Sequence, residues 1–306
     1  MKILITGSTG QVGYELQRQL AGLGTITAVD RQQCNLADAD SIRACVAHVK
    51  PDWIINAGAW TAVDKAEAEA ERDAAFAVNA VNAEAPRVLA ELAAAHGARL
   101  VHYSTDYVFA GDKRGRYRED DPVQPLNAYG ASKLAGEQAI AEVVRRSGLQ
   151  AWTFRTTWVF GTHGNNFLKT MLKLAQVKDS LSVVNDQFGA PTSAALIAGV
   201  TGQLIRQVEA GKSVAPGLYH LAAAGETHWQ AYAQRVIAQA RALGLPTRIA
   251  PEQVQGIPAV QYPTPAARPA NSRLDCQHLE TALGVKLPDW TVGVDAVVAD
   301  LVRTGF

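Results

Sequence analysis

The sequence is poor in the residues that form disulfides, bind metals or enter membranes. It has only three cysteines, an odd number without the spacing of a disulfide framework or a metal site. Its seven histidines form no close ligand pairs, and no apolar run is long enough to cross a bilayer. These absences argue against a metal enzyme, a disulfide-rich secreted domain and an integral membrane protein.

A surplus of charge of either sign is also absent. Lys plus Arg and Asp plus Glu both number 29, so nothing suggests a basic face for nucleic acid or a membrane surface. We therefore expect a small molecule as the partner. The start "MKILITG" is too short for a secretory apolar segment, and we expect a reducing, cytoplasmic location.

Short β-rich runs alternate with longer helical runs through the first half of the chain. The composition, 48% hydrophobic and 19% charged, is typical of a globular protein with a sizeable core. The pattern predicts strands at 2–6, 25–29, 52–56, 98–104 and 151–156, and helices at 11–21, 40–50 and 74–96. Repeated βαβ units predict an α/β fold with a doubly wound, Rossmann-like parallel sheet that binds ligands beyond the carboxyl ends of its strands.

The second half is less regular and contains proline-rich connectors such as "PTPAARPAN". We expect residues 1–160 to form mainly a dinucleotide-binding domain. Residues 161–306 are expected to form mainly a smaller substrate-binding lobe, with segments that can return to the first domain.

The stretch "LITGSTGQVG" places glycines between a predicted strand and a predicted helix. Thr6 ends the strand, and Gly7, Gly10 and Gly13 allow backbone N–H groups to approach a pyrophosphate at the start of the helix. A tight connection that binds nothing is the alternative. The motif favours a dinucleotide.

Asp30 and Arg31, after the second strand, pull the cofactor preference in two directions. A carboxylate here accepts a hydrogen bond from the adenosine ribose of NAD, whereas a guanidinium pairs with the 2′-phosphate of NADP. Both NADPH and NADH therefore stay open. The alternative is that the two residues are exposed turn residues.

Two further strand ends point to the same crevice. "NAGAWT", residues 56–61, has small side chains that let a ligand lie against the backbone, and "YSTDYVF", residues 103–109, has hydroxyls and a carboxylate. For Ser104, Thr105 and Asp106, a capped turn without a catalytic role is at least as good an interpretation.

The stretch "NAYGASKLAGEQ", residues 127–138, has the pattern of a helix start. Tyr129 and Lys133 are four residues apart, so a helix places them side by side on one face. A partly buried aromatic ring packed on a lysine stem is the ordinary explanation for such a pair.

Together and in chain order, these motifs resemble the extended short-chain dehydrogenase/reductase family. The longer segments "TGSTGQVGYEL", "NAGAWTAVDKAE", "HYSTDYVFAG", "NAYGASKLAGE", "NDQFGAPTSA" and "RPANSRL" are similar, over nearly the whole chain, to its dTDP-4-dehydrorhamnose reductases. The resemblance implies reduction of the 4-keto group of dTDP-4-dehydro-L-rhamnose to dTDP-L-rhamnose by hydride from NADPH or NADH. Such an enzyme serves dTDP-rhamnose and cell-surface polysaccharide biosynthesis.

The resemblance also assigns catalytic roles. It implies that Tyr129 gives a proton to the substrate carbonyl oxygen and that Lys133 holds the nicotinamide ribose and lowers the pKa of the phenol. A phenol with a pKa near 10 needs a shift of roughly 3 units, about 4 kcal/mol, to exchange protons easily at neutral pH. Thr105 takes the place of the hydroxyl that orients the carbonyl, with Ser104 as the alternative.

Binding residues follow from the same resemblance and from the motifs above. The expected cofactor-binding residues are Gly7, Gly10, Gln11, Val12, Gly13, Asp30, Arg31, Asn35, Leu36, Ala57, Gly58, Ala59, Thr61, Tyr129 and Lys133. The expected substrate-binding residues are Thr105, Asp106, Trp158, Asn166 and Arg268. Asn271 is a weaker candidate for the nucleotide diphosphate. Asn79 matches an asparagine that organises such sites, but a polar helix residue that faces solvent is the ordinary explanation. For Trp158, a core aromatic is an equally good explanation.

No metal is expected. Some members of the resembling family pair through magnesium held by a glutamate of the first helix and acidic residues after "GAPT". Glu15 is present here, but Ala195 and Gly199 occupy the later positions. We therefore expect a monomer or a metal-independent homodimer. The alternatives for function are another nucleotide-sugar reductase or epimerase, or a dinucleotide-binding regulatory subunit.

Overall fold

Six parallel strands form the large sheet of the computed structural model, which describes residues 1–72 and 76–305. The spatial order is β2-β1-β3-β4-β5-β10, and every neighbouring pair is parallel. The strands are β1 Lys2–Thr6, β2 Thr25–Val29, β3 Trp53–Asn56, β4 Arg99–Thr105, β5 Ala151–Thr156 and β10 Gly217–His220. Both faces of such a sheet need covering, which explains why the central strands are nearly continuous apolar runs.

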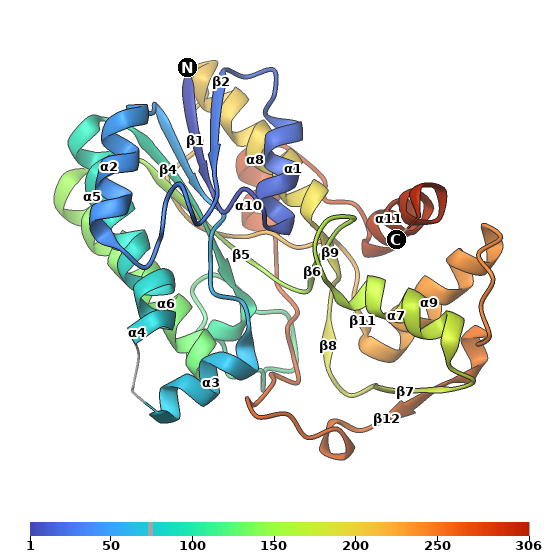
Figure 1. Cartoon of the computed structure of the whole chain (residues 1–306). Helices are drawn as coiled ribbons and strands as arrows, with labels where there is room; N and C mark the ends of the chain where they lie inside the picture. The colour runs from blue at the N-terminus through green and yellow to red at the C-terminus, as the bar shows by residue number, and fades with distance from the viewer. Residues whose placement is uncertain (73–75, 306) are drawn as a thin grey trace.

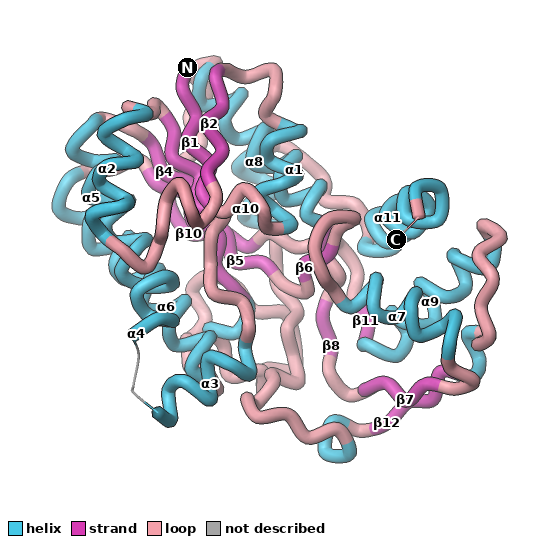
Figure 2. The backbone as a smooth tube through the Cα atoms, in the orientation of Figure 1, coloured by secondary structure: helices cyan, strands magenta, loops and turns pink. Residues whose placement is uncertain are grey.

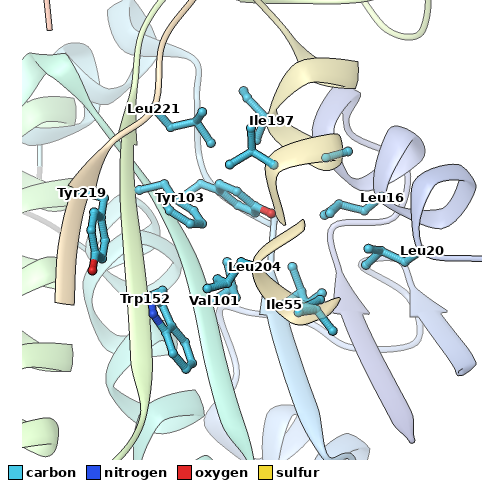
Figure 3. Packing of buried hydrophobic residues seen from close by; sticks show 14 of the residues in the cluster. Leu16, Leu20, Ile55, Val101, Tyr103, Trp152, Ile197, Leu204, Tyr219 and Leu221 are labelled. Atoms are coloured by element: carbon cyan, nitrogen blue, oxygen red, sulfur yellow. The ribbon is translucent and has the colours of Figure 1, made fainter. Parts of the chain in front are cut away.

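Helices cover the sheet on both faces (Figure 1). One face carries α1 Gln11–Gln19, α8 Ala194–Glu209 and α10 Gln277–Leu283; the other carries α2 Ala39–Val49, α5 Ala85–His96 and α6 Ala128–Ser147. Figure 3 shows the first core, in which Leu16 of α1, Leu20 just after this helix, and Ile197 and Leu204 of α8 meet the apolar side chains of the sheet.

Elements from the second half of the chain complete this large layer. Helix α8 packs along α1, strand β10 extends the sheet beside β5, and α10 packs against α8 and β10. The dinucleotide-binding layer is therefore built from segments on both sides of residue 160. We propose a domain division that assigns these returning segments to the first domain.

The smaller lobe lies beside the large layer (Figure 2). Its helices are α7 Phe167–Val177, α9 Trp229–Ala242 and α11 Trp290–Thr304, which share one apolar core. Its short strand pairs are β7 Leu181–Val184 with β12 Val254–Ile257, and β8 Phe188–Gly189 with β11 Thr227–His228. Between the layers, β6 Val159–Phe160 pairs with β9 Thr192–Ser193.

The predicted fold class, a doubly wound parallel sheet, is confirmed. The five predicted strands agree with the expected ranges to within one residue, whereas β10, at the edge of the same sheet, was not predicted. The helix expected at 74–96 differs: residues 74 and 75 lie outside the described residues, and the rest is α4 Phe76–Asn79, a π-helical turn Ala80–Glu84 and then α5. A π-helical turn adds one residue to a helical turn, so side chains before and after it change phase.

The sheet order fixes where a ligand can bind. The chain leaves β1 toward β2 on one side and later continues to β3 on the other, so the order reverses between β1 and β3. Loops that leave these two strands diverge and open a crevice at their carboxyl ends. In Figure 1 these ends face away from the labelled N-terminus, toward α3 Val63–Arg72.

The fold predicts that a helix from the second half stabilises the large layer. Leu204 of α8 is 1% exposed in the core of Figure 3. Leu204→Ala should lower the free energy of unfolding by about 2–5 kcal/mol, because it leaves a cavity. Leu243→Ala, at a side chain that is 43% exposed, is the matched control and should cost less than about 0.5 kcal/mol. Urea unfolding measures both, and equal losses would contradict the assignment of α8 to this core.

Candidate active site

The glycine turn after β1 crosses the end of β3 at backbone contact distance. Gly7 has φ +69°, and a Cβ at this position would lie 2.5 Å from Gly58 Cα. A Cβ on Gly13 would lie 2.1 Å from the Gly7 carbonyl oxygen. Neither position accepts a larger residue without moving backbone, so these glycines permit a close junction of β1, α1 and the loop after β3.

Helix α1 begins at this junction without a side-chain cap. Its N-cap residue is Gly10, which has no side chain to bond the first backbone N–H groups. Free N–H groups and the positive end of the helix dipole make this terminus suitable for a phosphate anion. Gln11 and Val12 form its first turn, and Gln11 Oε1 accepts a hydrogen bond from Nδ2 of Asn166, the N-cap residue of α7, at 2.9 Å.

A cavity of about 200 Å³ adjoins the glycine turn at the β1–β3 switch point. Among the predicted residues it is lined by Gly7, Asp30, Arg31, Asn35, Leu36, Gly58 and Ala59. Sequence reasoning missed Thr9, Cys34, Ala37, Trp60, Ala77 and Val81, which complete the lining. Ala57 and Thr61 do not line it, and Thr61 is exposed. The position and mostly apolar lining suit an adenosine group.

Asp30 has a local structural role in addition to facing this cavity. Its Oδ1 accepts hydrogen bonds from the backbone N–H groups of Gln32, at 2.8 Å, and Gln33, at 3.0 Å. Only Oδ2 is left for a ribose hydroxyl. Arg31 is exposed at the same cavity, so both of the opposing cofactor determinants border the same site.

A buried asparagine joins the loop after β3 to helix α6. In the π-helical turn, Asn82 accepts from Trp60 N at 2.8 Å and donates to Trp60 O and Ser132 Oγ, each at 3.0 Å. Asn79, which the sequence suggested for an organising role, is exposed. The π-helical turn explains the difference, because its extra residue brings Asn82 to the inner face.

Helix α6 carries Tyr129 and Lys133 in the arrangement that their spacing predicts. Asn127 caps the helix by accepting from Gly130 N at 2.8 Å. Tyr129 is half-buried, whereas Lys133 is 2% exposed. Lys133 Nζ donates to Tyr103 O at 2.7 Å and lies 3.2 Å from His102 Nε2.

His102 belongs to a polar row that sequence reasoning missed. Its Nδ1 lies 3.0 Å from Asn56 Nδ2, and the Thr6 hydroxyl donates to Asn56 Oδ1 at 2.7 Å. The row crosses from β4 through β3 to β1 under the carboxyl edge of the sheet. The only signal in the sequence is that Thr6, Asn56 and His102 are polar residues inside otherwise apolar strands.

Burial dominates the pKa values of the two α6 side chains. It raises the pKa of Tyr129 to about 12, partly opposed by the Thr105 hydroxyl and reinforced by Asp106. Burial lowers the pKa of Lys133 to about 8, and the carboxylate of Glu137 opposes this shift. In the protein alone burial therefore keeps the phenol a protonated donor at neutral pH, and the acidification that the resemblance implies stays a prediction.

Thr105 and Asp106 combine a capped turn with unpaired polar atoms. Thr105 Oγ1 accepts from Tyr107 N at 3.2 Å and donates to Asp106 Oδ1 at 3.2 Å, so the alternative structural role is present. Among the described residues, Asp106 Oδ2, Ser104 Oγ and Thr156 Oγ1 are buried without partners. Burial also raises the pKa of Asp106 to about 6, against the effect of neighbouring hydroxyls, first that of Ser272. Such unpaired groups suit a polyhydroxylated ligand.

Arg268 approaches this edge from the connector before α10. Its Nη2 donates to Asp64 Oδ2 at 2.9 Å, and within the described residues its Nη1 is buried without a partner. Both Asp106 and Arg268 affect the pKa of Tyr107, which burial raises, so the guanidinium lies in the same neighbourhood. One terminal nitrogen of the guanidinium is therefore held by Asp64, and the other is available to an anion.

Trp158, Asn166 and Asn271 lie where other contacts already occupy them. Trp158 has φ +44° and stacks on Trp229 with ring centroids 3.7 Å apart, which covers one indole face. Asn166 caps α7 through Lys169 N and also donates to Gly161 O. The Asn271 amide donates to two carbonyl oxygens of the 113–115 loop and accepts from the next arginine. For these three, the contacts found are structural.

Comparison with known proteins places this geometry in a family. The family model described as "RmlD substrate binding domain" matches residues 1–303. The dTDP-4-dehydrorhamnose reductase of Burkholderia thailandensis is 45% identical over 305 residues, which cover 98% of this chain and 99% of that protein. This chain belongs to the dTDP-4-dehydrorhamnose reductase family.

Two further members give the same result. The dTDP-4-dehydrorhamnose reductase of Escherichia coli K12 is 45% identical over 308 residues, 99% of each chain. The crystal structure of the Bacillus anthracis dTDP-4-dehydrorhamnose reductase in complex with NADP has a TM-score of 0.86 and 31% identity, covering 98% of this chain and 99% of that one. The family membership expected from the motifs is confirmed, and the roles of individual residues remain predictions.

The adenosine cavity predicts the effect of Asp30 on cofactor preference. Asp30→Asn keeps the Oδ1 acceptor for the turn but removes the charge that repels a 2′-phosphate. The ratio of NADPH to NADH affinity should rise about tenfold, a change of about 1.4 kcal/mol. Arg31→Ala is the matched variant and should move the ratio the other way. Fluorescence titration of both reduced cofactors checks this, and an unchanged ratio in both variants would place the 2′-position elsewhere.

Proposed function

We propose that this chain reduces the 4-keto group of dTDP-4-dehydro-L-rhamnose to dTDP-L-rhamnose, with hydride from NADPH or NADH. The observation that carries this proposal is the meeting of Thr105, Tyr129 and Lys133 at the sheet edge that also holds the glycine turn. Family membership over the full length supports the substrate. This reaction would serve the biosynthesis of dTDP-rhamnose and of cell-surface polysaccharides.

The residues present fit a nicotinamide dinucleotide. The junction of Gly7, Gly13 and Gly58 leaves no room for a Cβ, and the uncapped start of α1 suits a pyrophosphate. The cavity with Asp30 and Arg31 would hold the adenosine end. When bound there, the reduced nicotinamide supplies the hydride. The NADP complex of the Bacillus anthracis relative supports this cofactor class.

The α6 side chains supply the acid function. Tyr129 is protonated in the resting protein and can donate to the carbonyl oxygen of the sugar as that oxygen gains negative charge. Charged Lys133 stabilises the phenolate that results, because the two side chains lie one helical turn apart. Thr105 Oγ1 is within reach of the same oxygen if its proton turns from Asp106 to the substrate.

The substrate would lie on the side of the sheet edge that carries the unpaired polar atoms. Asp106 Oδ2 is suited to accept from a sugar hydroxyl, and Arg268 Nη1 to bind a diphosphate oxygen. Trp229 and the backbone of Gly189 both pack against the Trp158 indole, so Trp158 would border the ligand only with the part of the ring that they leave uncovered. Asn166 would act indirectly, by fixing Gln11 at the start of α1.

We further propose a cytoplasmic enzyme that acts as a monomer or a metal-independent homodimer. The three cysteines are free, which supports a reducing compartment. No helix in the described part of the chain combines the length and apolar character of a membrane span. Glu15 is 5% exposed and pairs with Arg18 at 3.1 Å, so it is not free to bind a cation.

The proposed acid predicts the effect of Tyr129→Phe. Removing the phenolic hydroxyl while keeping the ring should lower kcat by about 10²–10⁴-fold and leave cofactor affinity nearly unchanged. Tyr107→Phe, in a ring that packs edge-on against Tyr129, is the control and should change kcat less than tenfold. NADPH oxidation with a panel of 4-keto nucleotide sugars measures both. If Tyr129→Phe is as active as the unaltered protein, the assignment of Tyr129 as the proton donor is wrong. If the unaltered protein binds cofactor but turns over none of the sugars, a regulatory subunit is favoured.

The residues around Glu15 predict an assembly that does not depend on magnesium. Over residues 1–72 and 76–305 no group of three or more His, Cys, Asp or Glu side chains is placed to hold a metal ion. Light scattering should give the same mass with EDTA and with magnesium, because Mg²⁺ gives up its water reluctantly for few ligands. A dimer that dissociates with EDTA and reforms with magnesium would contradict this expectation.

A further inference from the structure

His102 stands between the proposed catalytic lysine and polar side chains that the reaction does not use. Its Nε2 lies 3.2 Å from Lys133 Nζ, and its Nδ1 lies 3.0 Å from Asn56 Nδ2. The Thr6 hydroxyl continues the row with a 2.7 Å bond to Asn56 Oδ1. Thr6 is 0%, Asn56 1%, His102 1% and Lys133 2% exposed. The row therefore starts at the lysine and ends inside the sheet, without a path to solvent at its far end.

The hydrogen positions along this row depend on the charge of Lys133. A neutral imidazole has one N–H and one bare nitrogen, so only one of its nitrogens accepts a hydrogen bond. When Asn56 Nδ2 donates to Nδ1, Nε2 carries the proton and donates to Lys133, which must then be an uncharged amine. An ammonium group has no lone pair, so it requires the other tautomer, with Nε2 bare and Nδ1 protonated.

Asn56 can serve both tautomers by turning its amide. In the orientation found, its nitrogen faces His102 and its oxygen faces Thr6. A half-turn exchanges the two, so that the oxygen accepts from His102 Nδ1–H and the nitrogen donates to the Thr6 hydroxyl. A hydroxyl both donates and accepts, and Thr6 therefore fits either orientation. All three contacts of the row survive a change of charge at its end.

We propose that His102 is a positioning residue for Lys133. The tautomer of His102 follows the charge of the lysine, and Asn56 turns its amide in step. The inference deepens the proposed function, on which its catalytic meaning rests. The protons balance when Lys133 loses its charge: the ammonium gives one proton to Nε2, Nδ1 releases one to water during a transient opening of the row, and the imidazole carries one proton before and after. His102 thus holds Nζ in place beneath the active site in both charge states.

Other charged groups around Lys133 support an ammonium as the working state. Glu137 lies one turn further along α6 and favours the charged form. Its carboxylate is itself held by Arg155 Nη2 on β5 at 2.7 Å. Tyr129 is on the same helix. From β4, the carbonyl oxygen of Tyr103 accepts a hydrogen bond from the lysine, and His102 contacts it. Burial competes with these groups and sets the pKa of Lys133 at about 8.

His102 itself stays neutral over the working range. Burial first, and then the charge of Lys133, hold the pKa of His102 well below its usual range. A second positive charge beside the lysine is therefore excluded, and only the position of the imidazole proton can change. Because an ammonium makes a charge-assisted bond to Nε2, loss of the imidazole should destabilise the charged lysine more than the neutral one.

Nuclear magnetic resonance of the ring nitrogens tests the coupling without relying on activity. The full chain with ¹⁵N-labelled histidine is titrated from pH 6 to pH 10, and the His102 signals are assigned by their loss in His102→Gln. We expect the Nδ1-protonated tautomer at low pH and the Nε2-protonated tautomer at high pH, with a midpoint near 8. In Lys133→Met this transition should vanish. A single tautomer across the range, or a transition that persists in Lys133→Met, overturns the proposal.

The pH profile of kcat tests the positioning role. Lys133 loses its charge as the pH rises through its pKa, so kcat of the unaltered protein should fall above about pH 8. His102→Leu should move this alkaline limb to lower pH by about one unit. His102→Gln should restore it, because an amide can accept or donate by turning. A uniform loss of kcat in His102→Leu, with the limb unmoved, would show a merely structural histidine. No turnover by the unaltered protein would refute the proposed function, while the tautomer titration would still decide the coupling.

Discussion

Burial of the Lys133 side chain is the constraint around which the active site is built. A lysine that is 2% exposed loses its water and needs protein partners in return. Tyr103 O, His102 and the charge of Glu137 supply them, and Glu137 in turn requires the buried Arg155. Breaking a buried pair by removing one partner is costly, so these residues are fixed together. Two neighbouring strands, β4 and β5, and helix α6 are thus committed to holding a single ammonium group.

A second constraint, the close junction of glycine backbones, positions the cofactor relative to that lysine. Because Gly7 lies at backbone contact distance from Gly58, the turns that follow β1 and β3 pack directly against each other. Asn82 then connects the loop after β3 to α6 through Trp60 and Ser132. The turn proposed for the pyrophosphate and the helix that carries Tyr129 are linked by these few contacts. Chemistry and cofactor binding therefore share one rigid frame.

Much of this frame could be predicted from the sequence, because local rules govern it. The alternation of short β-rich runs with helical runs predicted the large sheet, and the glycine spacing predicted the turn. The i to i+4 spacing predicted that Tyr129 lies beside Lys133. The extra residue of the π-helical turn could not be predicted, since helical periodicity continues on both sides of it. The resemblance pointed to Asn79, which lies just before this turn and is exposed, and no sequence pattern indicated Asn82. The row from Thr6 to His102 depends on strand order and register, which no local pattern specifies.

The stacked pair of Trp158 and Trp229 has an optical consequence. Trp158 lies between β5 of the large sheet and the short strand β6, whereas Trp229 begins α9 of the smaller lobe. Their ring planes are inclined by only 17°, with centroids 3.7 Å apart, so the two indoles absorb and emit as a coupled pair of chromophores. Both rings pack against the apolar core of the smaller lobe, so a change in how α9 packs there changes that coupling. The chain therefore carries an intrinsic spectroscopic signal of the packing of α9 against the segment before β6.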